Sequence, residues 1–388
     1  MSYRKQSKIE QPWVPVVSST GKPLMPCHPA RARKLITKGR AEPKRLKDFY
    51  YISLLDREDG EVQDICVGID PGSKREGYTV LSEHRTLLNV QTHAAPGNLI
   101  KKSMEGRSDA RRARRNRNTP CRAPKFLNRS RKNFLPPSTK ARWQRKLNMV
   151  KFFSRLYPVT KVAVEDVNTE AKKGSYFNPV MMGKNWLYRH LENLGLGVTK
   201  YRGNQTASYR RRLGLYKTDK KLTSGFNAHC VDSWVIANET LGKRTYVDLK
   251  QVVELIHHKF TRRQLHRFNY SKGGIRRRYG GTMSLGVQKG TLCHYKGKLG
   301  YIGGNTDKGR FSTHSSMTGS RVTQIAKLED MKLLSYLPWR VIRHGVSVFS
   351  RSTKRVTRLN RLALKLAKVG ITNSRVFRQL REGPLPHS

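Results

Sequence analysis

The chain has 388 residues, 36% of them hydrophobic, which is enough for two or three domains with packed cores. Its 79 lysines and arginines outnumber its 26 aspartates and glutamates, so the formal net charge is +53. That much self-repulsion in a compact fold needs a polyanion to offset it, and nucleic acid is the polyanion that we expect. A membrane surface fits less well, because the sequence has no run of about 18 apolar residues and its basic segments lack a continuous apolar face.

The cysteines and the first residues indicate the compartment. The five cysteines are odd in number and widely scattered and form no Cys-x-x-Cys pair, so we expect neither a disulfide framework nor a zinc ribbon. The first six residues, Met-Ser-Tyr-Arg-Lys-Gln, contain no apolar signal core, which predicts an intracellular protein.

Residues 1–57 predict a small α/β unit. Trp13–Val17 and Phe49–Leu55 have the apolar pattern of strands, and Ala30–Lys38 predicts a short basic helix that ends at Gly39. Between them lies Pro-Leu-Met-Pro at 23–26, which by itself predicts only a turn with two apolar residues.

The segment 65–80 carries the first candidate metal ligand. Its apolar residues predict a short buried strand that ends at Asp70, a turn at Pro71–Gly72, and a second strand from Gly77. A carboxylate at a rigid strand end is well placed to bind a metal, because neighbouring strands can bring further carboxylates to the same point. The alternative is a tight turn capped by an aspartate, and this segment alone leaves both interpretations open.

The residues 107–117 form a dense arginine run. A helix there has only two alanines as apolar members and therefore no face to bury against a protein core. A solvated basic tract is the alternative, but the position of the run inside the chain and the overall charge favour binding to a phosphate backbone. The candidate nucleic-acid-binding arginines are Arg107, Arg111, Arg112, Arg114, Arg115 and Arg117.

Two later segments add acidic residues at similar positions. After an amphipathic helix over 140–157, the strand 161–167 carries Glu165 near its carboxyl end, although a Glu-Asp pair at a strand exit is also ordinary surface chemistry. Asp166 is the alternative ligand if the strand is shifted by one residue. The segment 227–238 predicts a helix in which His229 and Asp232, three residues apart, share one face. A lone histidine is more often structural, but this pair follows Asp70 and Glu165 and so favours a site.

The composition changes from about residue 247. Short apolar runs broken by glycines predict a small barrel, and aromatic residues alternate with basic ones as on a nucleic-acid surface. Arg276, Arg277 and Arg278 are candidate nucleic-acid-binding residues there. The residues 350–381 predict a basic helical segment that Gly370 interrupts.

In their order and spacing, these segments resemble the IscB and IsrB group of transposon-encoded RNA-guided nucleases, which are related to the type II CRISPR effectors. The resemblance extends to about residue 320. The segment 206–217 resembles the one that leads into the third RuvC motif. The matching motifs are 23–26 for the PLMP domain, 68–73 for the first RuvC motif, 107–117 for the bridge helix, 162–165 for the second RuvC motif and 229–232 for the third.

One departure separates the two members of the group. IscB proteins carry an HNH nuclease domain between the second and third RuvC motifs. Here the 63 residues 166–228 contain no cysteine, and His190 is their only histidine, so an HNH domain does not fit. The chain therefore resembles IsrB, in which RuvC is the only nuclease. Glu76 stands where the family often has a small polar residue, and we expect it to have no effect on catalysis.

The resemblance implies an α/β fold with an RNase H-like RuvC domain that is split in the sequence. The implied boundaries are 1–57 for the PLMP domain, 58–104 for RuvC part I, 105–132 for the bridge helix, 133–246 for RuvC parts II and III, 247–330 for a β-rich domain that contacts a target-adjacent motif, and 331–388 for a basic C-terminal segment.

The resemblance also implies the chemistry and the partners. Asp70, Glu165 and Asp232 would hold two Mg²⁺ or Mn²⁺ ions about 4 Å apart, and His229 would orient or deprotonate the attacking water. A large structured omega RNA would guide the enzyme to double-stranded DNA, whose displaced non-target strand it would nick. We expect a monomer within the ribonucleoprotein, no membrane partner, and a location in prokaryotic cytoplasm at the nucleoid.

Two other functions remain open at this point. One is an RNA-independent nuclease of the Holliday-junction resolvase type, against which the arginine-rich helix and the N-terminal unit argue. The other is a non-catalytic RNA-binding protein, which the high basicity favours. Three acids at positions appropriate to one fold, in a chain poor in acids, argue against the second.

Overall fold

The structure is a computed structural model. It describes residues 13–47, 49–93, 97–116, 135–169, 178–220, 223–242, 251–257, 268–269, 274–275, 282–306 and 308–344. The predicted basic helical segment at 350–381 lies outside these residues. None of the helices in the described part of the chain is long and apolar enough to cross a membrane.

The N-terminal unit is a four-stranded sheet with one helix. Its elements are β1 (Val14–Val17), β2 (Pro23–Cys27), α1 (Pro29–Thr37), β3 (Ala41–Leu46) and β4 (Phe49–Leu54), and the strand order is β2-β1-β4-β3. The predicted helix and the two predicted strands are confirmed. The residues Pro23–Pro26, which by themselves predicted a turn, instead belong to strand β2. Prolines are tolerated there because β2 lies at the edge of the sheet, where a missing N–H leaves no neighbouring strand unpaired.

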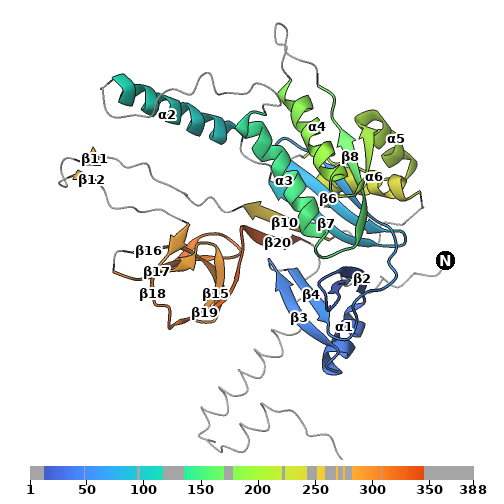
Figure 1. The fold of residues 1–388 in the computed structure, drawn as a ribbon, viewed down its shortest axis with the longest axis horizontal. Helices are drawn as coiled ribbons and strands as arrows, with labels where there is room; N and C mark the ends of the chain where they lie inside the picture. Colours follow the sequence, from blue (N-terminus) through green and yellow to red (C-terminus); the bar gives the residue numbers. More distant parts are fainter. Residues whose placement is uncertain are drawn as a thin grey trace, which may run out of the picture. The chain divides into compact units, whose positions relative to one another are not determined.

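A seven-stranded sheet forms the centre of the described chain. Its strands are β5 (Ile65–Asp70), β6 (Arg75–Ser82), β7 (Thr86–His93), β8 (Val159–Asp166), β9 (Gly197–Arg202), β10 (Val252–His257) and β20 (Trp339–His344), and their order is β20-β10-β7-β6-β5-β8-β9 (Figure 1). The first three form an antiparallel meander, and β8 and β9 continue the sheet parallel to β5. The order β7-β6-β5-β8-β9 with these directions is that of the RNase H-like fold, which confirms the predicted fold class.

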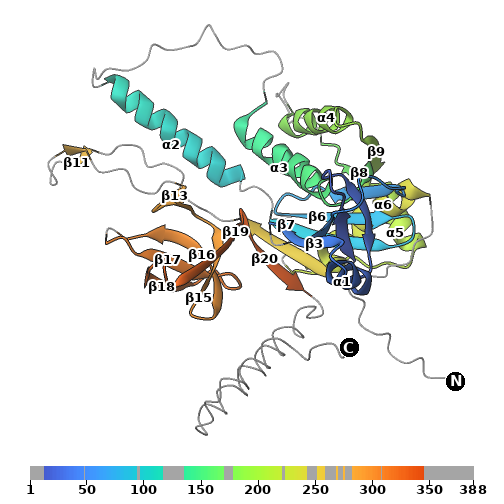
Figure 2. The same ribbon diagram turned by 60° about the horizontal axis from the view of Figure 1, so that its bottom comes forward.

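Helices cover both faces of this sheet. They are α3 (Pro137–Phe153), α4 (Pro179–Glu192), α5 (Gly203–Arg212) and α6 (Val231–Leu241), and α6 is preceded by a π-helical turn, η1 (Phe226–Cys230). Figure 2 shows α3 and α4 on the same side of the sheet. Residues of α3 and α4 share one hydrophobic core with Val67 and Ile69 of β5, whereas α6 shares another with Cys66. Side chains alternate between the faces of a strand, so the even-numbered residues of β5 face α6.

A buried ion pair ties α3 to the sheet. Glu76 of β6 is fully buried, and the Lys146 ammonium from α3 lies 2.6 Å from its Oε1. The Tyr78 hydroxyl donates a hydrogen bond to Glu76 Oε2 at 2.7 Å. Burial, and then the charge of Glu76, raise the pKa of Tyr78 well above its usual value. Glu76 is therefore part of the packing between α3 and β6.

The C-terminal strands form a separate sheet and also extend the central one. An antiparallel sheet of order β18-β17-β16-β15-β19 is built from β15 (Thr291–Tyr295), β16 (Lys298–Asn305), β17 (Phe311–Ser315), β18 (Arg321–Ala326) and β19 (Met331–Tyr336). Four short strands precede it: β11 (Phe268–Asn269), β12 (Gly274–Ile275), β13 (Met283–Ser284) and β14 (Val287–Gln288). The predicted domain boundaries at 247 and 331 do not coincide with the sheets, because β10 and β20 follow these boundaries in the sequence and yet belong to the central sheet. β10 and β20 pair with each other, and β10 pairs with β7, because the buried side chains of Val252 and Leu255 complete the central core.

Candidate metal centre

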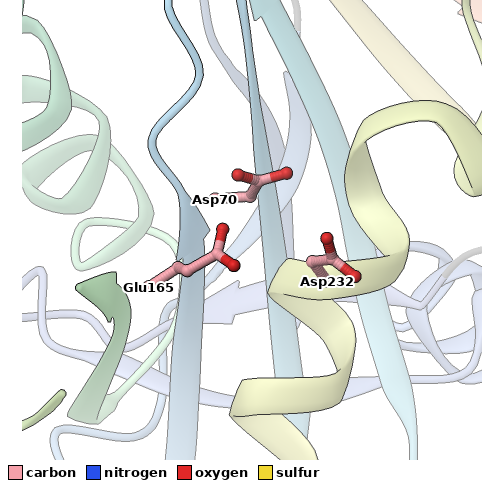
Figure 3. A group of neighbouring side chains, drawn as sticks. All are labelled: Asp70, Glu165 and Asp232. Carbon is pink, nitrogen blue, oxygen red and sulfur yellow. The ribbon is translucent and has the colours of Figure 1, made fainter. Parts of the chain in front are cut away.

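Three carboxylates from distant parts of the chain meet at one edge of the central sheet. Asp70, Glu165 and Asp232 each offer a carboxylate oxygen, and these oxygens all lie within 4.8 Å of one another. Asp70 and Asp232 are buried, and Glu165 is half-buried. Figure 3 shows the three side chains pointing toward one another from β5, β8 and α6. The structure thus brings together the three acids that the sequence predicted as metal ligands.

The pairing of β5 with β8 places two of them. The strands are parallel, and Ile69 lies opposite Val164, so the next residue of each strand is an acid at the same edge. Val162 and Val164 belong to the core on the α3 and α4 side, while Ala163 packs on the α6 side. Glu165 therefore faces α6, as Asp70 does.

The third acid depends on a close approach of α6 to the sheet. Asp232 lies in the first turn of α6, and the next residue, Ser233, has its carbonyl oxygen directly above Gly68 of β5. A Cβ on Gly68 would lie 1.8 Å from this oxygen, and a Cβ on Gly77 of β6 would lie 1.7 Å from the His229 carbonyl oxygen. Only glycine permits backbone contact this close. The two glycines bring Asp232 within reach of Asp70.

The predicted alternative ligand, Asp166, faces the other way. The Lys184 ammonium of α4 lies 2.6 Å from Asp166 Oδ1, and the Tyr188 hydroxyl donates a hydrogen bond to the same oxygen at 2.7 Å. Burial opposes ionisation of Asp166, but these two partners hold its pKa below the usual value. The strand is therefore not shifted by one residue, and Asp166 stabilises the packing of α4 on β8.

The acidic cluster is electrostatically strained. Burial raises the pKa of Glu165 to about 8, and the negative charges of Asp70 and Asp232 add to this shift. Three carboxylates in one place repel one another unless cations lie between them. Oxygen donors without sulfur or imidazole suit hard divalent ions such as Mg²⁺ and Mn²⁺, so the residues present fit such ions.

Two basic side chains that the sequence analysis did not single out as site residues contact the cluster. The Lys217 ammonium lies 3.2 Å from Asp70 Oδ2 and also donates to Asp232 Oδ2, while the Arg210 guanidinium donates to Asp232 Oδ1. Burial works against the charged form of Lys217, but the carboxylates of Asp70 and Asp232 raise its pKa above the usual value. Both residues lie in the segment 206–217 that leads into the third motif. This position was the only feature of the sequence that could have indicated their place beside the carboxylates.

His229 is not part of the group formed by Asp70, Glu165 and Asp232. It is buried in η1, and the three carboxylates make up the potential metal-binding group found among the described residues. The sequence predicted one regular helix over 227–238, but the helix begins with a π-helical turn. The α-helical spacing that paired His229 with Asp232 therefore does not hold across this turn. The role of His229 in orienting or deprotonating water stays a prediction.

The arginine-rich segment is a helix with an exposed surface. α2 (Gly97–Asn116) begins before the predicted position 105, and the side chains of Arg107, Arg111, Arg112 and Arg115 are exposed. This confirms the prediction that these arginine side chains are not buried against the protein core. The side chain of Arg114 and the residues Arg117, Arg276, Arg277 and Arg278 lie outside what the structure describes, so their assignments stay predictions.

A family model and several solved structures match parts of this chain. Residues 14–182, a little under half of the chain, match the family described as RRXRR protein, and Arg111–Arg115 reads Arg-Arg-Ala-Arg-Arg within that region. No curated protein matches the chain.

Among solved structures, T. thermophilus RuvC in complex with a Holliday junction substrate is 17% identical, with a TM-score of 0.26, over 45% of this chain and 90% of that one. The yeast mitochondrial Holliday junction resolvase Ydc2 is 12% identical, with a TM-score of 0.25, over 46% and 79%. A CRISPR-Cas12f ternary complex is 16% identical, with a TM-score of 0.26, over 53% and 47%. The fold assignment rests on the strand order of the central sheet.

Proposed function

We propose that this protein is an RNA-guided, divalent-metal-dependent endodeoxyribonuclease of the IsrB type. In this proposal a single RuvC site nicks the displaced non-target strand next to a target-adjacent motif, and a large omega RNA serves as the guide. The observation that carries the proposal is the meeting of Asp70, Glu165 and Asp232 at one edge of an RNase H-like sheet.

The three carboxylates define what the chain itself does in the reaction. Asp70, Glu165 and Asp232 would hold two Mg²⁺ ions, or Mn²⁺ in their place. When bound, such ions activate a water molecule and stabilise the leaving oxygen of an in-line displacement at phosphorus. The rigid strand ends fix Asp70 and Glu165, and the contact of α6 with Gly68 fixes Asp232, so the ligands are positioned before DNA arrives.

The region between the second and third motifs supports a single nuclease site. Its described residues form α4, β9 and α5, and β9 pairs with β8 in the central sheet. His190, the only histidine in this interval, packs against Trp186 with ring centroids 3.9 Å apart, and its Nδ1 lies 2.7 Å from the Trp186 carbonyl oxygen. These contacts give His190 a structural role within α4.

The exposed arginines of α2 and the net charge of +53 favour nucleic-acid partners. We assign α2 to the phosphate backbone of the guide RNA or its heteroduplex with DNA, where guanidinium groups bind oxygens in pairs. The proposal includes a monomeric protein in the ribonucleoprotein and a place at the nucleoid in prokaryotic cytoplasm.

The test is cleavage of a supercoiled plasmid library by protein that is co-expressed with its flanking genomic DNA, in Mg²⁺. We expect guide-matched nicked circles that are lost in Asp70→Ala. Asp166→Asn is the matched control, because it removes a neighbouring carboxylate on the opposite face and should retain nicking. Linear product would mean that a second strand is cut. Cleavage of four-way junctions without RNA would identify a resolvase, and RNA binding without any cleavage would identify an RNA-binding protein.

A further inference from the structure

The candidate metal centre already contains cations that belong to the chain. Asp232 has both carboxylate oxygens engaged, Oδ1 by the Arg210 guanidinium and Oδ2 by the Lys217 ammonium. Each Asp232 oxygen thus already has a cationic partner from the chain, with which a metal ion held by Asp232 would compete. The Asp232 carboxylate itself is largely shielded from water, since its side chain is 4% exposed.

Of the two cations, Lys217 is the one that contacts two carboxylates of the cluster. Its ammonium contacts Asp70 Oδ2 and Asp232 Oδ2 at once, whereas Arg210 pairs with Asp232 through the other oxygen, Oδ1. A metal ion held by Asp70 and Asp232 through these two oxygens would need the space that the ammonium occupies. Lys217 and such a cation therefore exclude each other, while Arg210 can stay in place.

The surroundings of Lys217 allow this exchange. Lys217 lies in the irregular segment between α5 and η1, and its side chain is 31% exposed, so part of it already reaches solvent. The backbone beside it is fixed, since the Thr218 N–H donates to the Asn227 carbonyl oxygen at 3.0 Å. A flexible four-carbon stem on a fixed backbone lets the charge move without unfolding the segment.

We propose that Lys217 is an internal counter-cation that holds Asp70 and Asp232 together in the metal-free protein and competes with divalent metal for them. This inference rests on the proposed metal-dependent function. It makes Lys217 a positioning residue that stabilises the empty centre and weakens metal binding. The metal-free chain then avoids unshielded repulsion between carboxylates, and the centre fills only when the metal displaces the ammonium.

The test is Mn²⁺ binding to the full-length chain freed of nucleic acid, followed by electron paramagnetic resonance of the unbound ion. Lys217→Met removes the charge and keeps most of the stem. We expect Mn²⁺ to bind this variant about tenfold more tightly than the unmodified protein. We also expect a lower melting temperature without metal and a larger rise in melting temperature when Mn²⁺ is added. Lys217→Arg keeps the charge and should stay close to the unmodified protein in Mn²⁺ affinity.

Lys184→Met is the matched control. Lys184 forms the comparable ion pair with Asp166 at the end of β8, and its side chain is 4% exposed. This variant should also melt at a lower temperature, but its Mn²⁺ affinity should not change. Equal or weaker Mn²⁺ binding by Lys217→Met would overturn the inference, because the lysine would then not compete with the metal.

Asp232→Asn separates this inference from the proposed function. If the cluster is a metal centre, this variant loses Mn²⁺ binding whatever Lys217 does. Unchanged binding in Asp232→Asn, or no binding to either the unmodified protein or Lys217→Met, would refute the metal centre and the inference with it. Binding that requires Asp232 but is not tightened by Lys217→Met would refute the inference alone.

Discussion

The close contact between α6 and β5 makes Gly68→Ala a direct test of how the metal centre is assembled. The new Cβ would lie 1.8 Å from the Ser233 carbonyl oxygen, and real Cβ contacts are longer than 3.0 Å. The backbone of α6 must therefore move away from β5 by at least about 1.2 Å, the difference between these distances. Strain of this kind costs about 1–3 kcal/mol, which lowers the melting temperature by roughly 2–4 °C per kcal/mol.

The displacement also separates Asp232 from Asp70. Metal–ligand distances tolerate errors of only about 0.2 Å, so we expect Mn²⁺ affinity to fall at least about tenfold. A mispositioning of about 1 Å can reduce a reaction rate by about a hundredfold, and we expect nicking to fall to that extent. The assays are thermal melting, Mn²⁺ binding and plasmid nicking on the same preparations.

Gly106→Ala in α2 is the control. A Cβ there meets no atom within 4 Å, and alanine in a helix interior is favoured over glycine by up to about 1 kcal/mol. This variant should keep Mn²⁺ binding and gain slightly in melting temperature. A Gly68→Ala protein with the melting temperature and the Mn²⁺ affinity of the unmodified chain would show that α6 does not depend on this contact.

Three further predictions concern charged side chains. The pKa of Glu165 is raised in the folded protein, so the folded state binds an extra proton below about pH 8, and stability without metal falls as pH rises toward that value. At about pH 8.5, the free energy of unfolding of Glu165→Gln should therefore be higher than that of the unmodified protein by up to a few kcal/mol, and near pH 4.5 the two should differ little. Equal urea denaturation curves for the two proteins at both pH values would contradict this. Glu76→Ala leaves the Lys146 ammonium buried without its carboxylate and should lose about 3–5 kcal/mol of stability, which Glu76→Leu combined with Lys146→Met should restore. Replacing Arg111 and Arg112 by alanine should leave the melting temperature unchanged but weaken RNA binding, and the slope of log affinity against log salt should fall by about one for each phosphate that is no longer neutralised.

Local patterns in the sequence determined the parts of the site that lie on single elements. The apolar runs before Asp70 and Glu165 predicted two strand ends, because a buried strand shows its length and period in the sequence itself. The sequence left Glu165 and Asp166 open as alternatives, and the structure decides for Glu165, because Asp166 pairs with Lys184 on the other face of the sheet. The arginine run predicted a helix without a buried face for the same reason, since a helix needs an apolar stripe to pack.

Only the tertiary structure decided what meets across the chain. The contact between Lys217 and Asp70 joins residues 147 positions apart, and no local period encodes such a pairing. The same holds for β10 and β20. In the sequence they lie before and after the strands of the small C-terminal sheet, and yet both belong to the central sheet, although the composition placed a domain boundary at 247. Backbone groups pair between strands, and charges pair between side chains, wherever the fold brings them together, whatever their distance in the sequence. The sequence therefore indicated the three carboxylates of the candidate centre, and the fold decided which cations stand beside them.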